Sequence, residues 1–177
     1  TRILGAITRT DLLRALHEDV LRKSSISVEG LKKGAGLMKN VTSLMEDRLP
    51  DRVIGILKKV GLVAESLGYS AYLVGGIVRD ILLGHENLDV DIVIEGDGIA
   101  FANHFAKDIP ARVKTHQKFG TAVILFSDGM KLDIATARTE YYKSPGALPT
   151  VETSSIKKDL YRRDFTINAL AIKLNPD

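Results

Sequence analysis

The sequence has no cysteine. This absence excludes disulfide bonds and zinc sites built on thiolates, and it fits a reducing compartment. Long apolar runs are also missing: no stretch approaches the roughly 20 residues that span a bilayer, and the first residues lack the apolar centre of a signal peptide. We therefore expect a cytoplasmic protein that makes no use of a membrane.

Charge of one sign is not in large excess. The 177 residues carry a net charge of +3, with 45% hydrophobic and 27% charged residues, which is ordinary for one soluble domain with a possible extra piece. The charges are unevenly spread, because residues 49–109 hold five Lys/Arg against nine Asp/Glu and residues 110–177 hold eleven against seven. An acidic patch beside a basic one suits a polyphosphate substrate, although two unrelated surface patches would give the same counts.

Two carboxylates open an apolar segment, "NLDVDIVIEGDG", at residues 87–98. The β-branched residues of this segment predict a strand, in which Asp89 and Asp91 point to the same face and repel each other. One interpretation is a solvated strand edge. The other is a site for Mg²⁺, which one or two carboxylates and substrate phosphates hold together.

Two glycines interrupt "YLVGGIVRD" at residues 72–80, between a predicted strand and a predicted helix. Gly75 and Gly76 allow close approach of the backbone to a ligand, and a helix N-terminus favours phosphate. A plain strand-to-helix turn would look the same. Because the Asp-x-Asp strand comes next, a phosphate cradle and a metal site can lie on adjacent strands.

The hydrophobic pattern predicts an α+β fold. A helix from about Pro50 has its apolar stripe at helical spacing and ends near Gly68. The further elements expected are strands at 70–74, at the Asp-x-Asp segment, at 111–115, 120–127, 130–136 and 168–174, and helices at 77–84, 98–107 and 154–163, with a hairpin turn at 127–129 and a loop containing Pro145 and Pro149. This order predicts a mixed sheet with helices on one side.

The beginning of the chain has a different character. Residues 3–7 predict a strand, followed by a helix whose N-cap is Thr8 or Thr10. One strand and one helix bury too little surface to form an independent domain. Residues 24–40 are rich in glycine and serine and predict a linker or a weak helix.

Four segments together resemble one known family. "LVGGIVRDILLG", "DVDIVIEGDG", "DIATARTEYY" and "DLYRRDFTINALAI" are similar, in this order, to the catalytic head of bacterial tRNA nucleotidyltransferases and poly(A) polymerases, of the polymerase-β-like nucleotidyltransferase superfamily. The resemblance covers about residues 50–175. The opening "GAITRTDLLRALH" resembles the end of a CBS domain, which some long bacterial members carry upstream with a DHH-type phosphoesterase. The implied organisation is a truncated CBS segment at 1–24, a linker or weak helix at 25–48, and the head at 49–177.

The resemblance assigns roles to the acids and glycines. It implies that Asp89 and Asp91 are the catalytic metal carboxylates, that Mg²⁺ is the cofactor, and that Gly75 and Gly76 grip the triphosphate. Asp133 matches an acidic position on a neighbouring strand that would complete the catalytic cluster. A solvent-facing strand acid is the alternative for Asp133.

The resemblance also implies a nucleotide-binding set in "RRDFTINA". Arg162 and Arg163 would lie near the phosphates of the incoming nucleotide, and Asp164 near its ribose. The alternative for the arginines is a favourable interaction with a helix C-terminus.

Two further arginines have open roles. Arg138 is expected in a loop, where it would reach phosphate or primer, or be an ordinary surface charge. Arg79 would bind the nucleotide or form a salt link with Asp80 within the protein. The four histidines have no metal-ligand spacing and are interpreted as structural or exposed; they are His17, His85, His104 and His116.

The function implied is Mg²⁺-dependent, template-independent transfer of AMP or CMP from ATP or CTP to the 3′ end of RNA, most directly the CCA, CC or A of tRNA. The alternatives are a poly(A) polymerase and a non-catalytic, CBS-linked module that binds nucleotide or RNA. In the family, a helical neck after the head selects the base, and it does not follow within these 177 residues. We therefore expect a fragment of a longer protein, whose base selection is not determined by this sequence.

Overall fold

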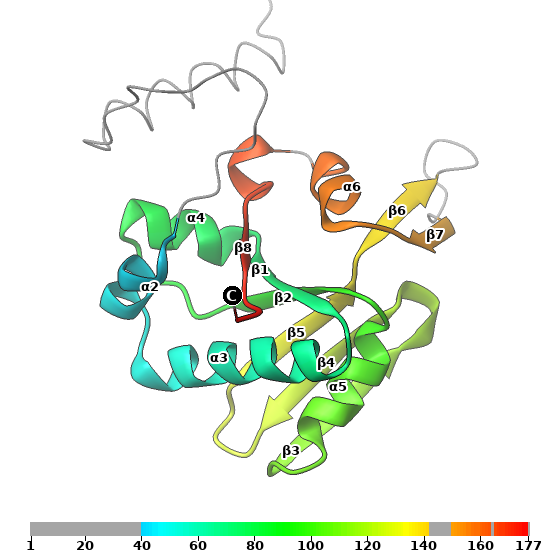
Figure 1. The fold of residues 1–177 in the computed structure, drawn as a ribbon, viewed down its shortest axis with the longest axis horizontal. Helices are drawn as coiled ribbons and strands as arrows, with labels where there is room; N and C mark the ends of the chain where they lie inside the picture. Colours follow the sequence, from blue (N-terminus) through cyan, green and yellow to red (C-terminus); the bar gives the residue numbers. More distant parts are fainter. Residues whose placement is uncertain (1–39, 142–149, 164, 177) are drawn as a thin grey trace, which may run out of the picture.

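The computed structural model describes residues 40–141, 150–163 and 165–176 (Figure 1). The expected CBS segment, most of the linker, the loop containing Pro145 and Pro149, and Asp164 lie outside these residues. Within the described ranges, no helix is long and apolar enough to cross a membrane.

The described chain alternates helices and strands much as the hydrophobic pattern predicts. The elements are α2 (Thr42–Arg48), α3 (Asp51–Ser66), β1 (Ser70–Val74), α4 (Gly76–Leu83), β2 (Val90–Glu95), α5 (Gly98–Ala106), β3 (Ala111–His116), the 3₁₀ turn η1 (Gln117–Phe119), β4 (Thr121–Phe126), β5 (Lys131–Thr136), β6 (Arg138–Tyr141), β7 (Thr150–Thr153), α6 (Ile156–Tyr161), the 3₁₀ turn η2 (Thr166–Asn168) and β8 (Ala171–Lys173).

The main sheet has the strand order β3-β4-β5-β2-β1-β8. Its central pair, β2 and β5, is parallel, and the other neighbouring pairs are antiparallel. The predicted mixed sheet is therefore confirmed. Figure 1 shows α3 and α5 crossing the sheet, with α6 lying beside β6 and β7.

Two expectations were wrong. Helices were expected on one side of the sheet, but α2 to α5 cover one face and α6 lies against the other. Arg138, which was placed in a loop, is the first residue of β6, and β6 pairs with β7 in a separate two-stranded sheet. Both strands are four residues long and polar in sequence, "RTEY" and "TVET". Neither segment has the apolar alternation by which a strand is found in a sequence.

The two faces of the main sheet differ. Alternate residues of each strand enter the large core that α2, α3, α4 and α5 cover, among them Leu73, Ile92 and Ile134. The opposite face has a small apolar cluster of Val74, Val93 and Ala137, against which Ile156 of α6 packs. The residues between the core positions thus face α6, and this face contains the candidate site.

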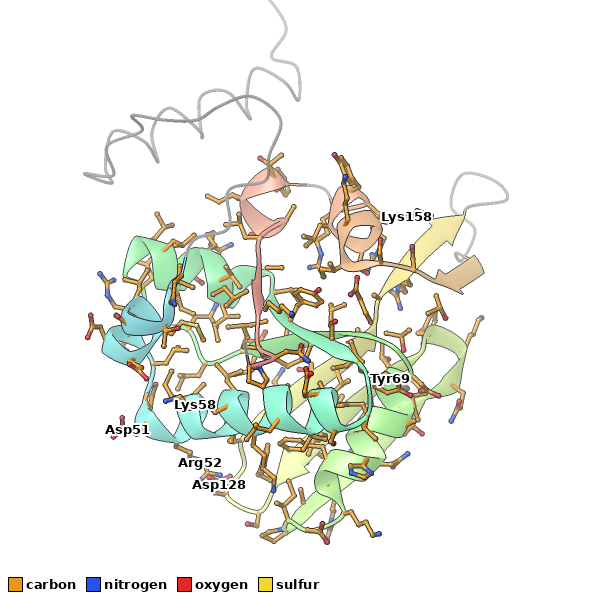
Figure 2. All side chains as sticks on the ribbon, in the orientation of Figure 1. Asp51, Arg52, Lys58, Tyr69, Asp128 and Lys158 are labelled. Carbon is orange, nitrogen blue, oxygen red and sulfur yellow. The ribbon has the colours of Figure 1, made fainter. Side chains whose placement is uncertain are left out.

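Helices α2 and α3 anchor the large core. Met45 of α2, which lies within the predicted linker or weak helix, is 8% exposed and packs into this core. The apolar stripe of α3 is buried as predicted, with Leu57 and Val60 at its centre. Figure 2 shows Arg52 of α3 directed toward Asp128 in the β4–β5 turn, with which it forms an ion pair.

The segment after β8 is fastened beneath α3. A Cβ atom on Gly61 would collide with the backbone carbonyl of Leu174, so only glycine permits this approach. Asn175, which is 9% exposed, accepts a hydrogen bond from the Ala71 N–H at 2.8 Å and donates one to the Tyr69 carbonyl at 2.9 Å. These contacts fix the end of β8 against β1 and α3.

Candidate active site

The turn between β1 and α4 brings three groups together. Gly75 has φ 78° and ψ −143°, a conformation open almost only to glycine. A Cβ atom at this position would lie 3.4 Å from Asp91 Oδ2 and 3.7 Å from Arg163 Nη1. The backbone of the turn, a carboxylate of β2 and a guanidinium from the end of α6 therefore meet at one place, beside the first turn of α4 at Gly76.

The register of the sheet aligns the acids. Asp91 lies opposite Val74 of β1 and opposite Asp133 of the parallel strand β5. Residues opposite each other in a sheet point to the same face, so Asp91 and Asp133 are neighbours on the face that α6 partly covers. Asp89 precedes β2 by one residue, is exposed, and by strand alternation belongs to this face as well.

The acids repel one another. The pKa of Asp91 is raised, first by burial and then by the charges of Asp89 and Asp133, while Arg163 and Lys131 oppose the shift. Lys131 Nζ lies 2.8 Å from Asp89 Oδ1 and 3.2 Å from Asp133 Oδ2, and these contacts raise the pKa of Lys131. The site thus concentrates negative charge that a cation relieves.

The residues fit a divalent cation by donor type and by charge. Mg²⁺ prefers oxygen ligands and is held by one or two carboxylates with waters and phosphates. In the described part of the chain, no three acidic or histidine side chains surround a common point. Asp89 and Asp91 would therefore need substrate oxygens to complete the coordination of the ion.

Helix α6 presents the arginines. Ile156 donates its N–H to Glu95 Oε1 at 2.6 Å, which holds the first turn of α6 on β2. Asp159 is 0% exposed. Its Oδ1 accepts hydrogen bonds from Arg162 Nη2 at 2.7 Å and Nε at 3.1 Å, and its Oδ2 accepts one from Arg163 Nη2 at 3.0 Å.

Comparison with known proteins identifies the family of this chain. Residues 71–177, more than half of the chain, match the model of the poly A polymerase head domain. The chain belongs to this family. The A-adding tRNA nucleotidyltransferase of Geobacter sulfurreducens is 51% identical over 177 residues, which are 99% of this chain and 20% of that protein.

Solved structures agree with this membership. An apo form of a CCA-adding enzyme superposes with a TM-score of 0.75 at 45% identity, over 80% of this chain and 34% of that one. The CCA-adding enzyme of Thermotoga maritima complexed with tRNA superposes with a TM-score of 0.68 at 40% identity, over 80% of this chain and 31% of that one. The chain thus spans about a fifth to a third of the length of these relatives.

Arg138 of this head domain lies away from the carboxylates. Its Nη1 donates to the Phe119 carbonyl at 2.7 Å, and it lines a cavity of about 330 Å³ with Gly96 and Thr136. Gly96 and Thr136 mark the C-terminal ends of β2 and β5, whereas the acids lie near the N-terminal ends. A role for Arg138 toward primer or phosphate stays a prediction.

Arg79 is engaged within the head domain. Its Nε and Nη2 donate to the two oxygens of Asp80 at 2.7 and 2.8 Å, and its Nη1 donates to Asn168 Oδ1 at 3.0 Å. Asp80 also accepts from Asn87 Nδ2 at 2.6 Å. These hydrogen bonds, chiefly those from Arg79, lower the pKa of Asp80. This geometry favours the salt link that the sequence offered as one role of Arg79.

The remaining predicted residues separate into two groups. Asp164 and His17 lie outside the described residues, so the ribose contact of Asp164 stays a prediction. His85, His104 and His116 are exposed.

Two residues of the site, Asp159 and Lys131, were not predicted from the sequence. For Asp159 a usable signal was present, because Arg162 and Arg163 follow it by three and four residues along a helix.

Proposed function

We propose that this chain is the catalytic head of an enzyme that transfers nucleotides from nucleoside triphosphates to the 3′ end of tRNA. The observation that carries the proposal is the meeting of the Gly75 turn, Asp91 and Arg163, with Asp133 beside Asp91. Support also comes from the relatives, which are named as A-adding and CCA-adding tRNA enzymes. Such an enzyme would act in the cytoplasm.

The residues of the chain divide the work. Asp89 and Asp91 would hold Mg²⁺, which supplies charge neutralisation at the α-phosphate and the leaving pyrophosphate. The first turn of α4 and Gly75 would offer backbone N–H groups to the triphosphate. Arg162 and Arg163 would bind phosphate oxygens, so that the 3′ oxygen of the RNA attacks the α-phosphorus in line with the departing pyrophosphate.

ATP is the first nucleotide to test as donor. The A-adding relative of Geobacter sulfurreducens is 51% identical to this chain over the aligned residues, whereas the CCA-adding enzyme of Bacillus pumilus is 39% identical. We propose addition of AMP to tRNA that already ends in CC. Transfer of CMP and synthesis of poly(A) are the other outcomes that the same head would catalyse.

The experiment uses the full-length protein with tRNA transcripts that end before the first C, before the second C or before the final A, each with labelled ATP or CTP. We expect incorporation that requires Mg²⁺ and is lost by at least about 100-fold in Asp91→Asn. Asp128→Asn, in the exposed turn near Arg52, is the matched control and should keep activity. Transfer that survives in Asp91→Asn, or no transfer by the wild-type protein to any transcript, would contradict the proposal.

A further inference from the structure

Asp159 is a buried carboxylate for which the proposed reaction has no direct use. It is 0% exposed, and burial of a charge without partners is unfavourable by several kcal/mol. Its hydrogen-bond donors are Arg162, Arg163 and the Arg138 N–H, the last at 3.3 Å. Asp159 thus ties the end of α6 to the start of β6.

Arg163 lies between two acids. Its Nη2 is 3.0 Å from Asp159 Oδ2, and its positive charge opposes the rise in the pKa of Asp91. Within the described residues, Arg163 forms an ion pair with Asp159 and none with Asp91. The Gly75 turn lies beside both Arg163 Nη1 and Asp91 Oδ2, so the guanidinium and the carboxylate of Asp91 meet at the same turn.

One donor of Arg163 is left for a ligand. Its Nε is buried and has no hydrogen-bond partner in the described part of the chain. A buried N–H without a partner is uncommon in native proteins and energetically unfavourable. The side chain as a whole is 23% exposed, and its Nη1 lies beside the Gly75 turn, where Asp91 also lies.

We propose that Asp159 is a positioning residue that holds Arg163 away from Asp91. In this arrangement Asp91 stays available to the cation and Arg163 to the triphosphate, whereas without Asp159 the two would pair and neutralise each other. The inference rests on the proposed function, because it takes Asp91 as a cation ligand and Arg163 as a phosphate ligand. It adds a role for a residue that touches neither cation nor nucleotide.

Asp159→Asn removes the charge and keeps the shape and one acceptor oxygen. Arg163 then loses its charged partner and turns to Asp91. We expect Mn²⁺, used as a probe for the cation, to bind about 10-fold more weakly, and the KM for ATP to rise by about 10- to 100-fold with a smaller change in kcat.

The test is a double-mutant cycle in the full-length protein, with Mn²⁺ binding measured by electron paramagnetic resonance. Asp159→Asn should weaken Mn²⁺ binding, Arg163→Met should leave it unchanged or tighten it, and the double variant should regain the affinity of Arg163→Met. Such a rescue is not produced by general loss of structure. Val60→Ala, on the buried face of α3, serves as a destabilised control whose Mn²⁺ affinity should match the wild type.

Two results would overturn the proposal: equal weakening of Mn²⁺ binding by Asp159→Asn with and without Arg163, or unchanged Mn²⁺ binding in Asp159→Asn. If Asp159→Asn does not fold, Arg163→Met alone still tests the proposal. Weaker Mn²⁺ binding in Arg163→Met would contradict a competition between Arg163 and the cation for Asp91. Failure of the proposed function is distinguishable. A wild-type protein that binds Mn²⁺ but transfers no nucleotide to tRNA would contradict the proposed function. The double-mutant cycle of Asp159 and Arg163 could still be interpreted from Mn²⁺ binding.

Discussion

Asp80 and Asp159 are both buried carboxylates paired with arginine, at 6% and 0% exposure, yet their surroundings differ. Asp80 receives Arg79 through both oxygens, and the remaining terminal nitrogen of Arg79 is bonded to Asn168. Asp159 receives two arginines, and one of them, Arg163, keeps a buried Nε without a partner among the described residues. The first network is closed and the second is open.

The difference teaches how one kind of interaction serves two purposes. A closed network satisfies each polar group within the protein, and it joins α4 to the segment before β2 through Asn87 and to η2 through Asn168. An open network beside the Gly75 turn keeps hydrogen-bonding capacity that the fold itself does not use. We therefore expect the pair of Asp80 and Arg79 to contribute mainly to stability, and ligand binding by Arg163 stays a prediction.

The largest expected effect is on kcat/KM, when Arg163 and Arg79 are each replaced by methionine in separate variants. Arg163→Met removes a preorganised donor from the site, so kcat/KM for ATP should fall by about 100- to 1,000-fold. Arg79→Met should act mainly on the free energy of unfolding and reduce kcat/KM less. The measurement is kcat/KM for ATP from steady-state kinetics, at a temperature at which both variants are folded. A larger loss of kcat/KM in Arg79→Met would break the comparison.

A smaller effect is expected from opening the closed network. Asp80→Ala leaves Arg79 and Asn87 without their shared acceptor, and removal of one partner of a buried pair typically costs about 3–5 kcal/mol. Arg79 is 32% exposed, so water replaces part of the lost interaction and we expect about 2–3 kcal/mol. Urea denaturation measures this value, with Asp128→Asn as an exposed control expected within about 0.5 kcal/mol of the wild type.

The smallest effect concerns the acids themselves. Because the pKa of Asp91 is raised above 3.8 in the folded protein, its ionised form opposes folding at neutral pH, and this penalty disappears as the pH falls toward 3.8. Asp91→Asn should therefore raise the melting temperature at pH 7, on the order of 1–3 °C, while it removes activity. Thermal unfolding at pH 7 and at pH 4 should show the gain shrinking at the lower pH; a loss of stability at pH 7 would contradict the repulsion.

Local patterns in the sequence predicted the local geometry of the site. The strand before Gly75, the helix after it and the phase of β2 all follow from residues close together in the chain. The phase of β2 is set by Ile92 and Ile94, which must enter the large core, and it turns Asp91 to the opposite face.

Partners distant in the chain could not be predicted in the same way. The parallel pairing that sets Asp91 beside Asp133 joins strands separated by α5, β3 and β4, and periodicity within either strand does not reveal it. For the same reason, the ion pair between Lys131 and Asp89 could not be predicted from the sequence. The β6–β7 hairpin was missed because its polar strands lack an apolar pattern, and with it the contact from β6 to Asp159. The family resemblance supplied the roles of the acids and arginines, which spacing alone left open.

The tight approach of Gly61 to Leu174 has a consequence for how the two sides of the sheet are linked. The segment that carries Arg162 and Arg163 is tethered at one end by α6 and at the other by β8, and β8 is fastened beneath α3. A larger residue at position 61 would push β8 away from α3, and the segment between α6 and β8 would then be held less firmly. In evolutionary terms, we expect that Gly61, a helix residue on the far side of the sheet in contact with neither acids nor arginines, is constrained together with the site.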